Sequence, residues 1–307
     1  MATPNGSVRP AISFPALEEM MYPRLEGLVR VVADAAALLK LRAEELSAVR
    51  VLMTSATNGC NSAMLAAMPS LGLIVSQGIG ADRFDTAALA ARGIRLRLVG
   101  EATDDVADLA MTLLNMIGRG LVRGDVFARS GAWQRGRFEV GESLVGKTIG
   151  IGGLSGRIGQ AIARRAVVSR MTVAGLRRKS NEGLVATLHD DWAALAAASD
   201  ILVLAMPASP ETRHVIGAAE LKALGPKGYL VNVGRGELVD TQAMIEALEQ
   251  KQIAGAALDV LEGEPVIPPR LAALANVVVS PHVGGGTRGA RNRAAKVAED
   301  EILAFLG

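Results

Sequence analysis

Short apolar runs alternate with amphipathic segments through the first hundred residues. An apolar run of about four to eight residues is typical of a buried strand, whereas apolar residues at helical spacing indicate a helix. An alternation of this kind predicts a parallel sheet with helices on both faces. The expected elements are strands at residues 49–54, 71–76 and 94–99, and helices at residues 61–68 and 86–92.

A longer amphipathic helix is predicted after this series. It starts with Asp104 and Asp105, whose carboxylates suit the positive end of a helix dipole, and it ends near Gly118. Residues 120–142 show little periodicity and carry Trp133. We interpret this stretch as a connection or an arm, and Trp133 as a packing residue.

Six further short apolar runs follow, most of them separated by helical segments. Strands of this type, joined by right-handed crossovers, predict a doubly wound sheet. The final helix, at residues 293–306, is expected to return to the first domain. We therefore predict an α/β fold with two doubly wound parallel-sheet domains, residues 1–98 with 288–307 and residues 99–287. The six strands are expected at 148–151, 171–174, 201–205, 229–233, 255–258 and 277–280.

The composition agrees with two domains and limits the function. The chain has 307 residues, of which half are hydrophobic but only 3% are aromatic, so the cores must consist mainly of aliphatic side chains. The net charge is +2, with acidic and basic residues mixed along the chain. Nucleic-acid binding needs clustered cations, so we expect no nucleic-acid partner.

The cysteine and histidine content points to a reducing compartment and no metal. Cys60 is the single cysteine, so we expect a buried thiol and a cytoplasmic protein without an internal disulfide. His189, His214 and His282 are far apart and lack ligand partners at metal spacing. Residues 1–13 lack the pattern of a signal peptide, and no apolar stretch reaches the roughly 18 residues of a membrane span.

The expected strand at 148–151 runs into a glycine-rich turn that opens a helix. This is the context of a dinucleotide-binding site, because glycines let the pyrophosphate approach the backbone and a helix N-terminus attracts its charge. Gly156 and Gly159 have the usual spacing, but Gly153 comes one residue early, with Ser155 as the extra residue. An ordinary glycine-rich turn is the alternative. The predicted cofactor-binding residues here are Gly153, Leu154, Ser155, Gly156, Arg157 and Ile158.

The next expected strand ends in cations. About 20 residues beyond the turn, a site that prefers NAD(H) places an Asp or Glu on the ribose hydroxyls. This chain has Leu176 there, followed by Arg177, Arg178 and Lys179. Cations without an acid are typical of a site for a 2′-phosphate, so we predict NADP(H) in preference to NAD(H). A solvated basic loop is the alternative.

Three loops that follow expected strands carry the candidate chemistry: residues 231–240, 258–265 and 280–287. Ligands of such folds gather beyond the carboxyl ends of the strands, so these loops can converge. They supply an arginine, a carboxylate and a histidine. Reduction of a 2-oxo acid needs a hydride and a proton for the carbonyl oxygen. An imidazolium can donate that proton, a carboxylate can orient the imidazole, and a guanidinium can bind the substrate through two hydrogen bonds.

Five motifs precede or separate these loops in a fixed order. They are Gly78-Ile-Gly-Ala-Asp82, Thr103-Asp-Asp-Val-Ala-Asp-Leu-Ala110, Arg129-Ser-Gly-Ala-Trp133, Asp200-Ile-Leu-Val-Leu-Ala-Met-Pro207 and Pro210-Glu-Thr212. With the three loops, they resemble the D-specific 2-hydroxy acid dehydrogenase family, most closely its glyoxylate/hydroxypyruvate and hydroxyphenylpyruvate reductase branch. The resemblance implies a Rossmann-like cofactor domain, a flavodoxin-like substrate domain with a cleft between them, and a homodimer.

The resemblance also implies roles for individual residues. Arg235 matches the substrate-binding arginine, Glu264 the carboxylate partner of the acid–base histidine, and His282 that histidine. Ile79 and Gly80 match the backbone pair that holds the substrate carboxylate. The positions that match residues lining the cofactor are Pro207, Thr212, Val233, Gly234, Asp259 and Gly284.

Some residues keep two interpretations. Glu262 lies two residues from Glu264, which we prefer because Glu264 precedes a proline as in the family pattern. His189 and His214 are interpreted as structural or exposed. The alternative for Trp133 is a role in the site of the partner subunit, since the corresponding region reaches toward the partner subunit in this family.

The chain departs from the family in the spacing of the glycine turn and at residues 95–101. Family members usually carry an Asn-Thr-Pro type of segment at the latter position, whereas this chain has Arg95 and Arg97. These arginines either contact an anionic substrate or are solvated strand residues.

The sequence thus favours an NAD(P)H-dependent reductase of a small 2-oxo acid, of the glyoxylate or hydroxypyruvate type, that forms the D-2-hydroxy acid. A reductase of a bulkier or phosphorylated 2-oxo acid is one alternative. A non-catalytic, cofactor-sensing protein on the same fold is another, although the chain shows no interaction tail.

Overall fold

The computed structural model of the chain describes residues 9–13, 22–81, 83–181 and 183–307. It divides into two compact units, Met1–Ala102 with Gly285–Gly307 (unit 1) and Thr103–Gly284 (unit 2). The predicted domain boundaries, residues 1–98 with 288–307 and residues 99–287, stay a prediction. The expectation about a signal peptide falls mostly on residues 1–8, which lie outside the described residues.

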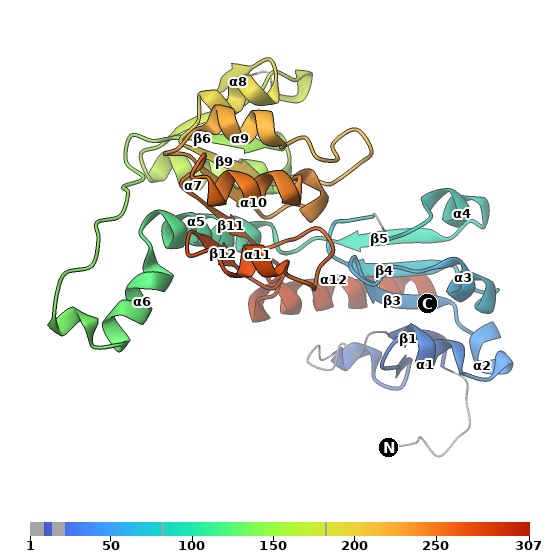
Figure 1. Cartoon of the computed structure of the whole chain (residues 1–307). Helices are drawn as coiled ribbons and strands as arrows, with labels where there is room; N and C mark the ends of the chain where they lie inside the picture. The colour runs from blue at the N-terminus through green and yellow to red at the C-terminus, as the bar shows by residue number, and fades with distance from the viewer. Residues whose placement is uncertain (1–8, 14–21, 82, 182) are drawn as a thin grey trace. The chain divides into compact units, whose positions relative to one another are not determined.

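The described residues of unit 1 form a five-stranded parallel sheet in the order β2-β1-β3-β4-β5, of which Figure 1 labels β1, β3, β4 and β5. Two of these strands, β1 and β2, were not predicted, because each has three residues and includes a polar one, so neither forms an apolar run. The strands are β1 (Ala11–Ser13), β2 (Val29–Val31), β3 (Val51–Ser55), β4 (Leu73–Gln77) and β5 (Arg95–Val99). The α-helices are α1 (Ala35–Leu39), α2 (Ala43–Ser47), α3 (Ser62–Ala67), α4 (Thr86–Ala91) and α12 (Arg288–Leu306), and residues Pro23–Leu25 form a short 3-10 helix.

The last helix, α12, packs against β4 and β5 of unit 1 through a face of small residues, with Ile302 fully buried. Two arginines of β5 also contact this helix. Arg97 forms an ion pair with Glu301 at 3.0 Å, and the guanidinium of Arg95 lies 5.5 Å from the centre of the Phe305 ring. The two arginines of residues 95–101 therefore hold the C-terminal helix in place.

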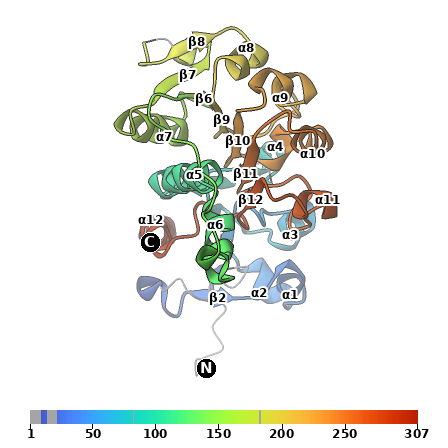
Figure 2. The ribbon, with the colours of Figure 1, turned by 60° about the vertical axis from the view of Figure 1, so that its left-hand side comes forward.

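Within the described part of unit 2, seven parallel strands have the order β12-β11-β10-β9-β6-β7-β8, which Figure 2 shows as a continuous series. The chain starts in the middle at β6 and builds the sheet first to one side and then to the other. Between β6 and β9 the order reverses, and ligands of open parallel sheets bind at such a point. The strands are β6 (Thr148–Gly152), β7 (Thr172–Leu176), β8 (Thr187–His189), β9 (Ile201–Leu204), β10 (Tyr229–Asn232), β11 (Gly255–Leu258) and β12 (Val277–Val279).

The six predicted strands of this series are present, and β8 is an additional edge strand. Helices cover both faces of the sheet, over two cores that are almost wholly aliphatic. The helices are α5 (Thr103–Gly118), α6 (Leu121–Arg129), α7 (Arg157–Val168), α8 (Trp192–Ala197), α9 (Ala218–Leu224), α10 (Thr241–Glu249) and α11 (Pro269–Ala272). Three 3-10 helices lie at Ala132–Gln134, Lys179–Asn181 and Gly236–Leu238. In the described residues, no helix is long and apolar enough to cross a membrane.

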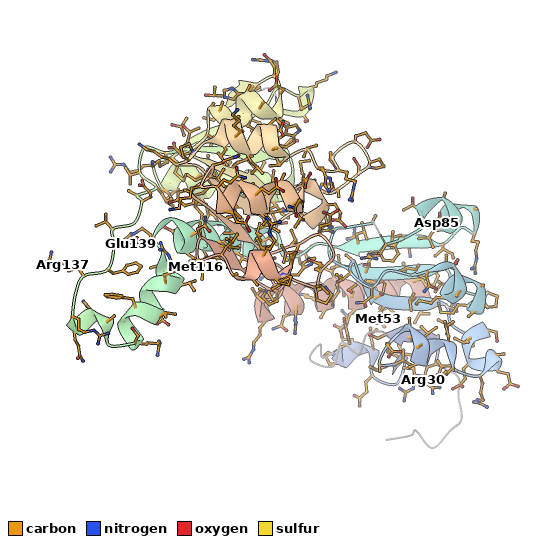
Figure 3. All side chains as sticks on the ribbon, in the orientation of Figure 1. Arg30, Met53, Asp85, Met116, Arg137 and Glu139 are labelled. Atoms are coloured by element: carbon orange, nitrogen blue, oxygen red, sulfur yellow. The ribbon has the colours of Figure 1, made fainter. Side chains whose placement is uncertain are left out.

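The segment at 120–142 contains helix α6, which the sequence did not predict. Helix α6 extends away from the seven-stranded sheet, and its residues, all of them described, include none that is buried (Figure 1). The segment folds back on itself where Phe127 packs on Phe138 and Arg123 pairs with Glu139, and Figure 3 shows Arg137 and Glu139 on the returning part. Trp133 is 71% exposed, so its interpretation as a packing residue within the chain was wrong.

Candidate active site

The glycine turn lies between β6 and α7, where the strand order reverses. Gly153 has a φ of +86°, and a Cβ there would lie 2.7 Å from the carbonyl oxygen of Ala205. A Cβ on Gly159 would lie 2.2 Å from the carbonyl oxygen of Gly153. Both positions therefore require glycine for packing. Gly156 is different, because it is exposed at the start of α7, where unpaired N–H groups can receive an anion.

The residues around Gly156 divide into exposed and buried ones. Ser155 and Arg157 are exposed, and Ile158 is partly buried. Leu154 is only 1% exposed, and its side chain belongs to the core. Of Leu154, only the main chain is available to a ligand.

The three cations after β7 have different environments. Arg177 forms an ion pair with Asp190 at 2.6 Å and donates to the Leu188 carbonyl oxygen at 3.1 Å. Arg178 and Lys179 are exposed and form no ion pair with any residue that the structure describes. No carboxylate occupies the position at the end of β7, where Leu176 lies. The loop thus fits a ligand with an additional negative charge.

The loops after β9 and β10 pack closely together. A Cβ on Gly234 would lie 2.6 Å from the carbonyl oxygen of Met206, so only glycine allows this approach. The hydroxyl of Thr212 accepts a hydrogen bond from the Ser209 amide at 2.7 Å and closes the loop after β9. Among the predicted cofactor-lining residues, Pro207 is exposed, Thr212 is partly buried and Val233 is 7% exposed.

Arg235 is held by a buried amide at the end of β10. Asn232, which is fully buried, donates from Nδ2 to the Arg235 carbonyl oxygen at 2.8 Å and accepts from the Gly234 amide at 3.1 Å. The Arg235 guanidinium also donates to the Gly234 carbonyl oxygen at 2.8 Å. Asn232 was not among the predicted site residues, although an amide at the end of an otherwise apolar strand is a usable signal.

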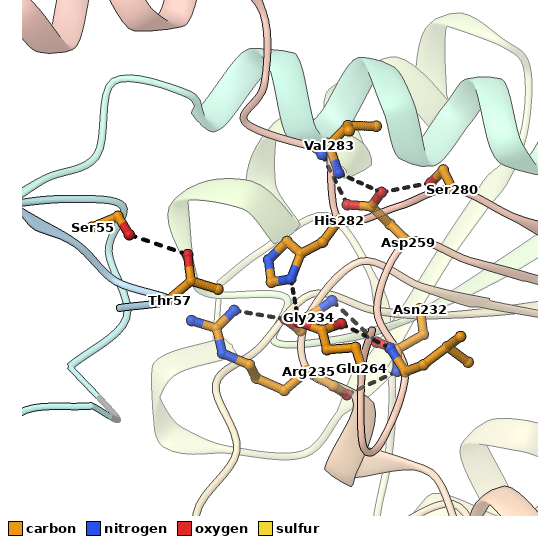
Figure 4. A network of polar contacts seen from close by, with 12 residues as sticks. Ser55, Thr57, Asn232, Gly234, Arg235, Asp259, Glu264, Ser280, His282 and Val283 are labelled. Atoms are coloured by element: carbon orange, nitrogen blue, oxygen red, sulfur yellow. Dashed lines mark hydrogen bonds and ion pairs between the residues drawn. The ribbon is translucent and has the colours of Figure 1, made fainter. Parts of the chain in front are cut away.

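His282 and Glu264 form a direct pair (Figure 4). Nδ1 of His282 lies 2.5 Å from Oε1 of Glu264, and both side chains are about one-third exposed. The second carboxylate oxygen of Glu264 accepts a hydrogen bond from the Leu261 amide at 3.2 Å. Because Nδ1 faces the carboxylate, Nε2 is the nitrogen available for proton transfer to a substrate.

The loop that carries His282 is fixed by Asp259, whose side chain is only 3% exposed. Oδ1 accepts hydrogen bonds from the Ser280 hydroxyl at 2.5 Å and the Val283 amide at 2.9 Å, and Oδ2 accepts one from the Gly284 amide at 2.9 Å (Figure 4). His282 has a φ of +52°, which non-glycine residues rarely adopt. The Asp259 contacts on both sides offset the cost of this conformation.

Glu262 belongs to a second histidine–glutamate pair. Nε2 of His214 lies 3.1 Å from Oε1 of Glu262, and Arg213 and the Thr241 hydroxyl also donate to this carboxylate. Burial acts to raise the pKa of Glu262, but the hydrogen bonds from His214 and Arg213 outweigh it and lower that pKa. The structure therefore separates the two glutamates: Glu262 binds His214, and Glu264 is the partner of His282.

Ile79 and Gly80 lie in unit 1, directly after β4. Gly78 starts this turn with a φ of +97°, and a Cβ there would lie 2.9 Å from the Cβ of Ala56. Ile79 is 50% exposed, whereas Gly80 is buried. Cys60, in the loop after β3, is buried as expected, and burial raises the pKa of its thiol to about 11.

The chain is similar to known proteins in sequence and in fold. Residues 111–284 match the family model of the D-isomer specific 2-hydroxyacid dehydrogenase NAD binding domain. Glyoxylate/hydroxypyruvate reductase A of Arabidopsis thaliana is 39% identical over 85% of this chain and 83% of its own length. Hydroxyphenylpyruvate reductase of Plectranthus scutellarioides is also 39% identical, over 87% of this chain and 83% of its own. A crystal structure of NADPH-dependent glyoxylate/hydroxypyruvate reductase from Sinorhizobium meliloti, with NADP and malonate, has a TM-score of 0.86 and 36% identity and covers 97% of this chain and 94% of that one.

The fold and these relatives define a nicotinamide-dependent oxidoreductase. The chain belongs to the D-isomer specific 2-hydroxyacid dehydrogenase family.

Replacement of Asp259 tests the clamp on the histidine loop. Asp259→Ala would leave one hydroxyl and two amides without their acceptor, so we expect the free energy of unfolding to fall by about 3 kcal/mol. Urea denaturation followed by circular dichroism measures this change. Asp125→Ala, which removes an exposed ion pair with Arg129, is the control and should cost less than about 1 kcal/mol. Equal losses would contradict the clamp.

Proposed function

We propose that this protein reduces a small 2-oxo acid, of the glyoxylate or hydroxypyruvate type, to the D-2-hydroxy acid with NADPH. The observation that carries the proposal is the His282–Glu264 pair, on a loop that Asp259 holds at the carboxyl edge of the cofactor-binding sheet. The names of the relatives supply the substrate class.

Each residue of the site has a proposed role. Arg235 binds the substrate through its guanidinium, and the main-chain amides of Ile79 and Gly80 hold the substrate carboxylate. His282 donates a proton from Nε2 to the carbonyl oxygen, while Glu264 orients the ring and stabilises the imidazolium. The bound nicotinamide supplies the hydride. In the reverse direction, the same imidazole accepts the proton of the hydroxyl group.

A panel of 2-oxo acids tests the activity. Glyoxylate, hydroxypyruvate, pyruvate and hydroxyphenylpyruvate should each be mixed with the enzyme and NADPH, and loss of absorbance at the nicotinamide band recorded. We expect either glyoxylate or hydroxypyruvate to give the highest kcat/KM of the four acids. Preference for hydroxyphenylpyruvate would select the alternative with a bulkier substrate, and absence of turnover on every acid would select a non-catalytic protein.

The two histidine–glutamate pairs provide matched variants for the mechanism. His282→Ala should lower kcat by about 10²- to 10⁴-fold, the usual contribution of general acid catalysis, without preventing NADPH binding. His214→Ala removes the other pair and should lower kcat far less. Stopped-flow single-turnover rates measure the chemical step. If His282→Ala keeps a near-normal rate, the proton donor is assigned incorrectly.

The cofactor preference rests on the cations after β7. We propose NADP(H) over NAD(H), because Arg178 and Lys179 form no ion pair with described residues and the strand ends at Leu176 instead of an acid. Arg178→Ala with Lys179→Ala should lower kcat/KM for NADPH by about tenfold or more, the order of one lost charge-assisted hydrogen bond, and leave the value for NADH nearly unchanged. A wild-type kcat/KM that favours NADH would refute the preference.

We propose further that the protein is a homodimer that uses the segment with α6. The supporting observation is the exposure of large apolar side chains on this segment, among them Val126 at 64% and Trp133 at 71%. Apolar side chains gathered on one segment mark association surfaces. Sedimentation velocity should show a dimer for the wild type and a monomer for Val126→Asp. A monomeric wild type would contradict the proposal.

A further inference from the structure

The extra residue of the glycine turn connects two parts of the cofactor site. The chain leaves β6 and forms a closed turn in which the Gly156 amide donates to the Gly153 carbonyl oxygen at 2.9 Å. This turn holds Leu154 and Ser155, one residue more than the regular G-x-G-x-x-G spacing allows. The additional length places two neighbouring side chains in opposite environments.

Leu154 anchors the turn on strand β7. A Cβ on Gly175 would lie 2.6 Å from Cδ2 of Leu154, so the leucine occupies the space that this glycine leaves open. Leu154 is 1% exposed, which makes it a fixed point of the turn. The next residue, Ser155, is exposed, and its hydroxyl donates to the hydroxyl of Ser180 at 3.1 Å.

Ser180 belongs to the basic loop after β7, and hydrogen bonds from the next residue, Asn181, also fix that loop. Asn181 is 5% exposed, its Nδ2 donates to the Leu176 carbonyl oxygen at 2.8 Å, and its amide donates to the Arg178 carbonyl oxygen at 2.8 Å. These contacts hold residues 177–180 in a tight turn. The hydroxyl of Ser180 therefore occupies a defined place between the cations and the glycine turn.

We propose that Ser155 and Ser180 form a two-hydroxyl site for the 2′-phosphate of NADP(H), and that Ser155 is a specificity-determining residue. The inference rests on the proposed preference for NADP(H). Two hydroxyls 3.1 Å apart can each donate to one phosphate group, and Arg178 and Lys179 on the same loop supply positive charge. Because Leu154 and Asn181, the chain neighbours of the two serines, are buried, the main chain at both serines is fixed before the cofactor binds.

The same pair discriminates between the two cofactors. A phosphate dianion offers several acceptor oxygens to the two hydroxyl donors, whereas the ribose 2′-hydroxyl of NAD(H) is a neutral group. Hydrogen bonds to charged groups are stronger than those between neutral groups. The extra residue of the turn therefore favours NADP(H).

Direct binding measurements test the proposal without catalysis. Isothermal titration calorimetry should give Kd for NADPH, NADH, adenosine 2′,5′-bisphosphate and AMP, with the wild type, Ser155→Ala and Ser180→Ala. We expect Ser155→Ala to raise Kd about tenfold for the two ligands that carry a 2′-phosphate, and less than about twofold for NADH and AMP. Ser62→Ala, an exposed serine at the start of α3 in unit 1, is the matched control and should change no Kd.

A deletion of Ser155 provides a second variant, because it restores the regular glycine spacing. It should lose the NADPH preference while it keeps NADH binding, and its unfolding curve shows whether it is folded. If the wild type itself binds NADPH no better than NADH, the proposed cofactor preference and this inference both fail. If the wild type prefers NADPH and Ser155→Ala keeps the full Kd ratio, while Arg178→Ala loses it, the role of Ser155 alone is overturned.

Discussion

The buried carboxylate of Asp259 accepts three hydrogen bonds from the loop after β12, and the conformation of that loop depends on them. A buried charge is costly unless it is fully hydrogen-bonded. The burial of Asp259 therefore requires this conformation of the loop, and the loop keeps its conformation only while Asp259 accepts its hydrogen bonds. The result is a left-handed conformation at His282 that directs its Nδ1 to Glu264. The contact between His282 and Glu264 therefore depends on the carboxylate of a third residue, Asp259.

Sheet topology brings the remaining parts of the site together. The seven strands that the structure describes in unit 2 run parallel, so the loops after β6, β7, β9, β10, β11 and β12 leave the same edge of one sheet. Glycines then set how closely these loops approach: Gly153 lies against the loop after β9, and so does Gly234. A buried amide, Asn232, and a buried carboxylate, Asp259, hold the loops that carry Arg235 and His282. Fixed supports of this kind keep a site in its reactive geometry before a ligand binds.

Much of this arrangement was predictable from the sequence, because its main strands are continuous apolar runs and β6 leads directly into a glycine turn. Strands β1, β2 and β8 escaped prediction because each is three residues long and mixes polar with apolar side chains, whereas the equally short β12 is a run of valines. Helix α6 escaped because none of its residues faces a core. The pairing of Glu262 with His214 and of Glu264 with His282 depends on the path of one short turn, which spacing alone does not specify. Likewise, the residue types could not show that Leu154 is a core residue or that Arg177 pairs with Asp190.

We propose that His282, held by Glu264 and the Asp259 clamp, delivers the proton to a 2-oxo acid bound by Arg235. The sharpest test is a crystal structure with NADP(H) and oxamate, an unreactive analogue of a 2-oxo acid. We expect Nε2 of His282 within hydrogen-bond distance of the oxamate carbonyl oxygen, the Arg235 guanidinium on the same molecule, and an intact His282–Glu264 contact. Oxamate bound away from His282, or a His282 ring turned from Glu264 in that complex, would contradict it.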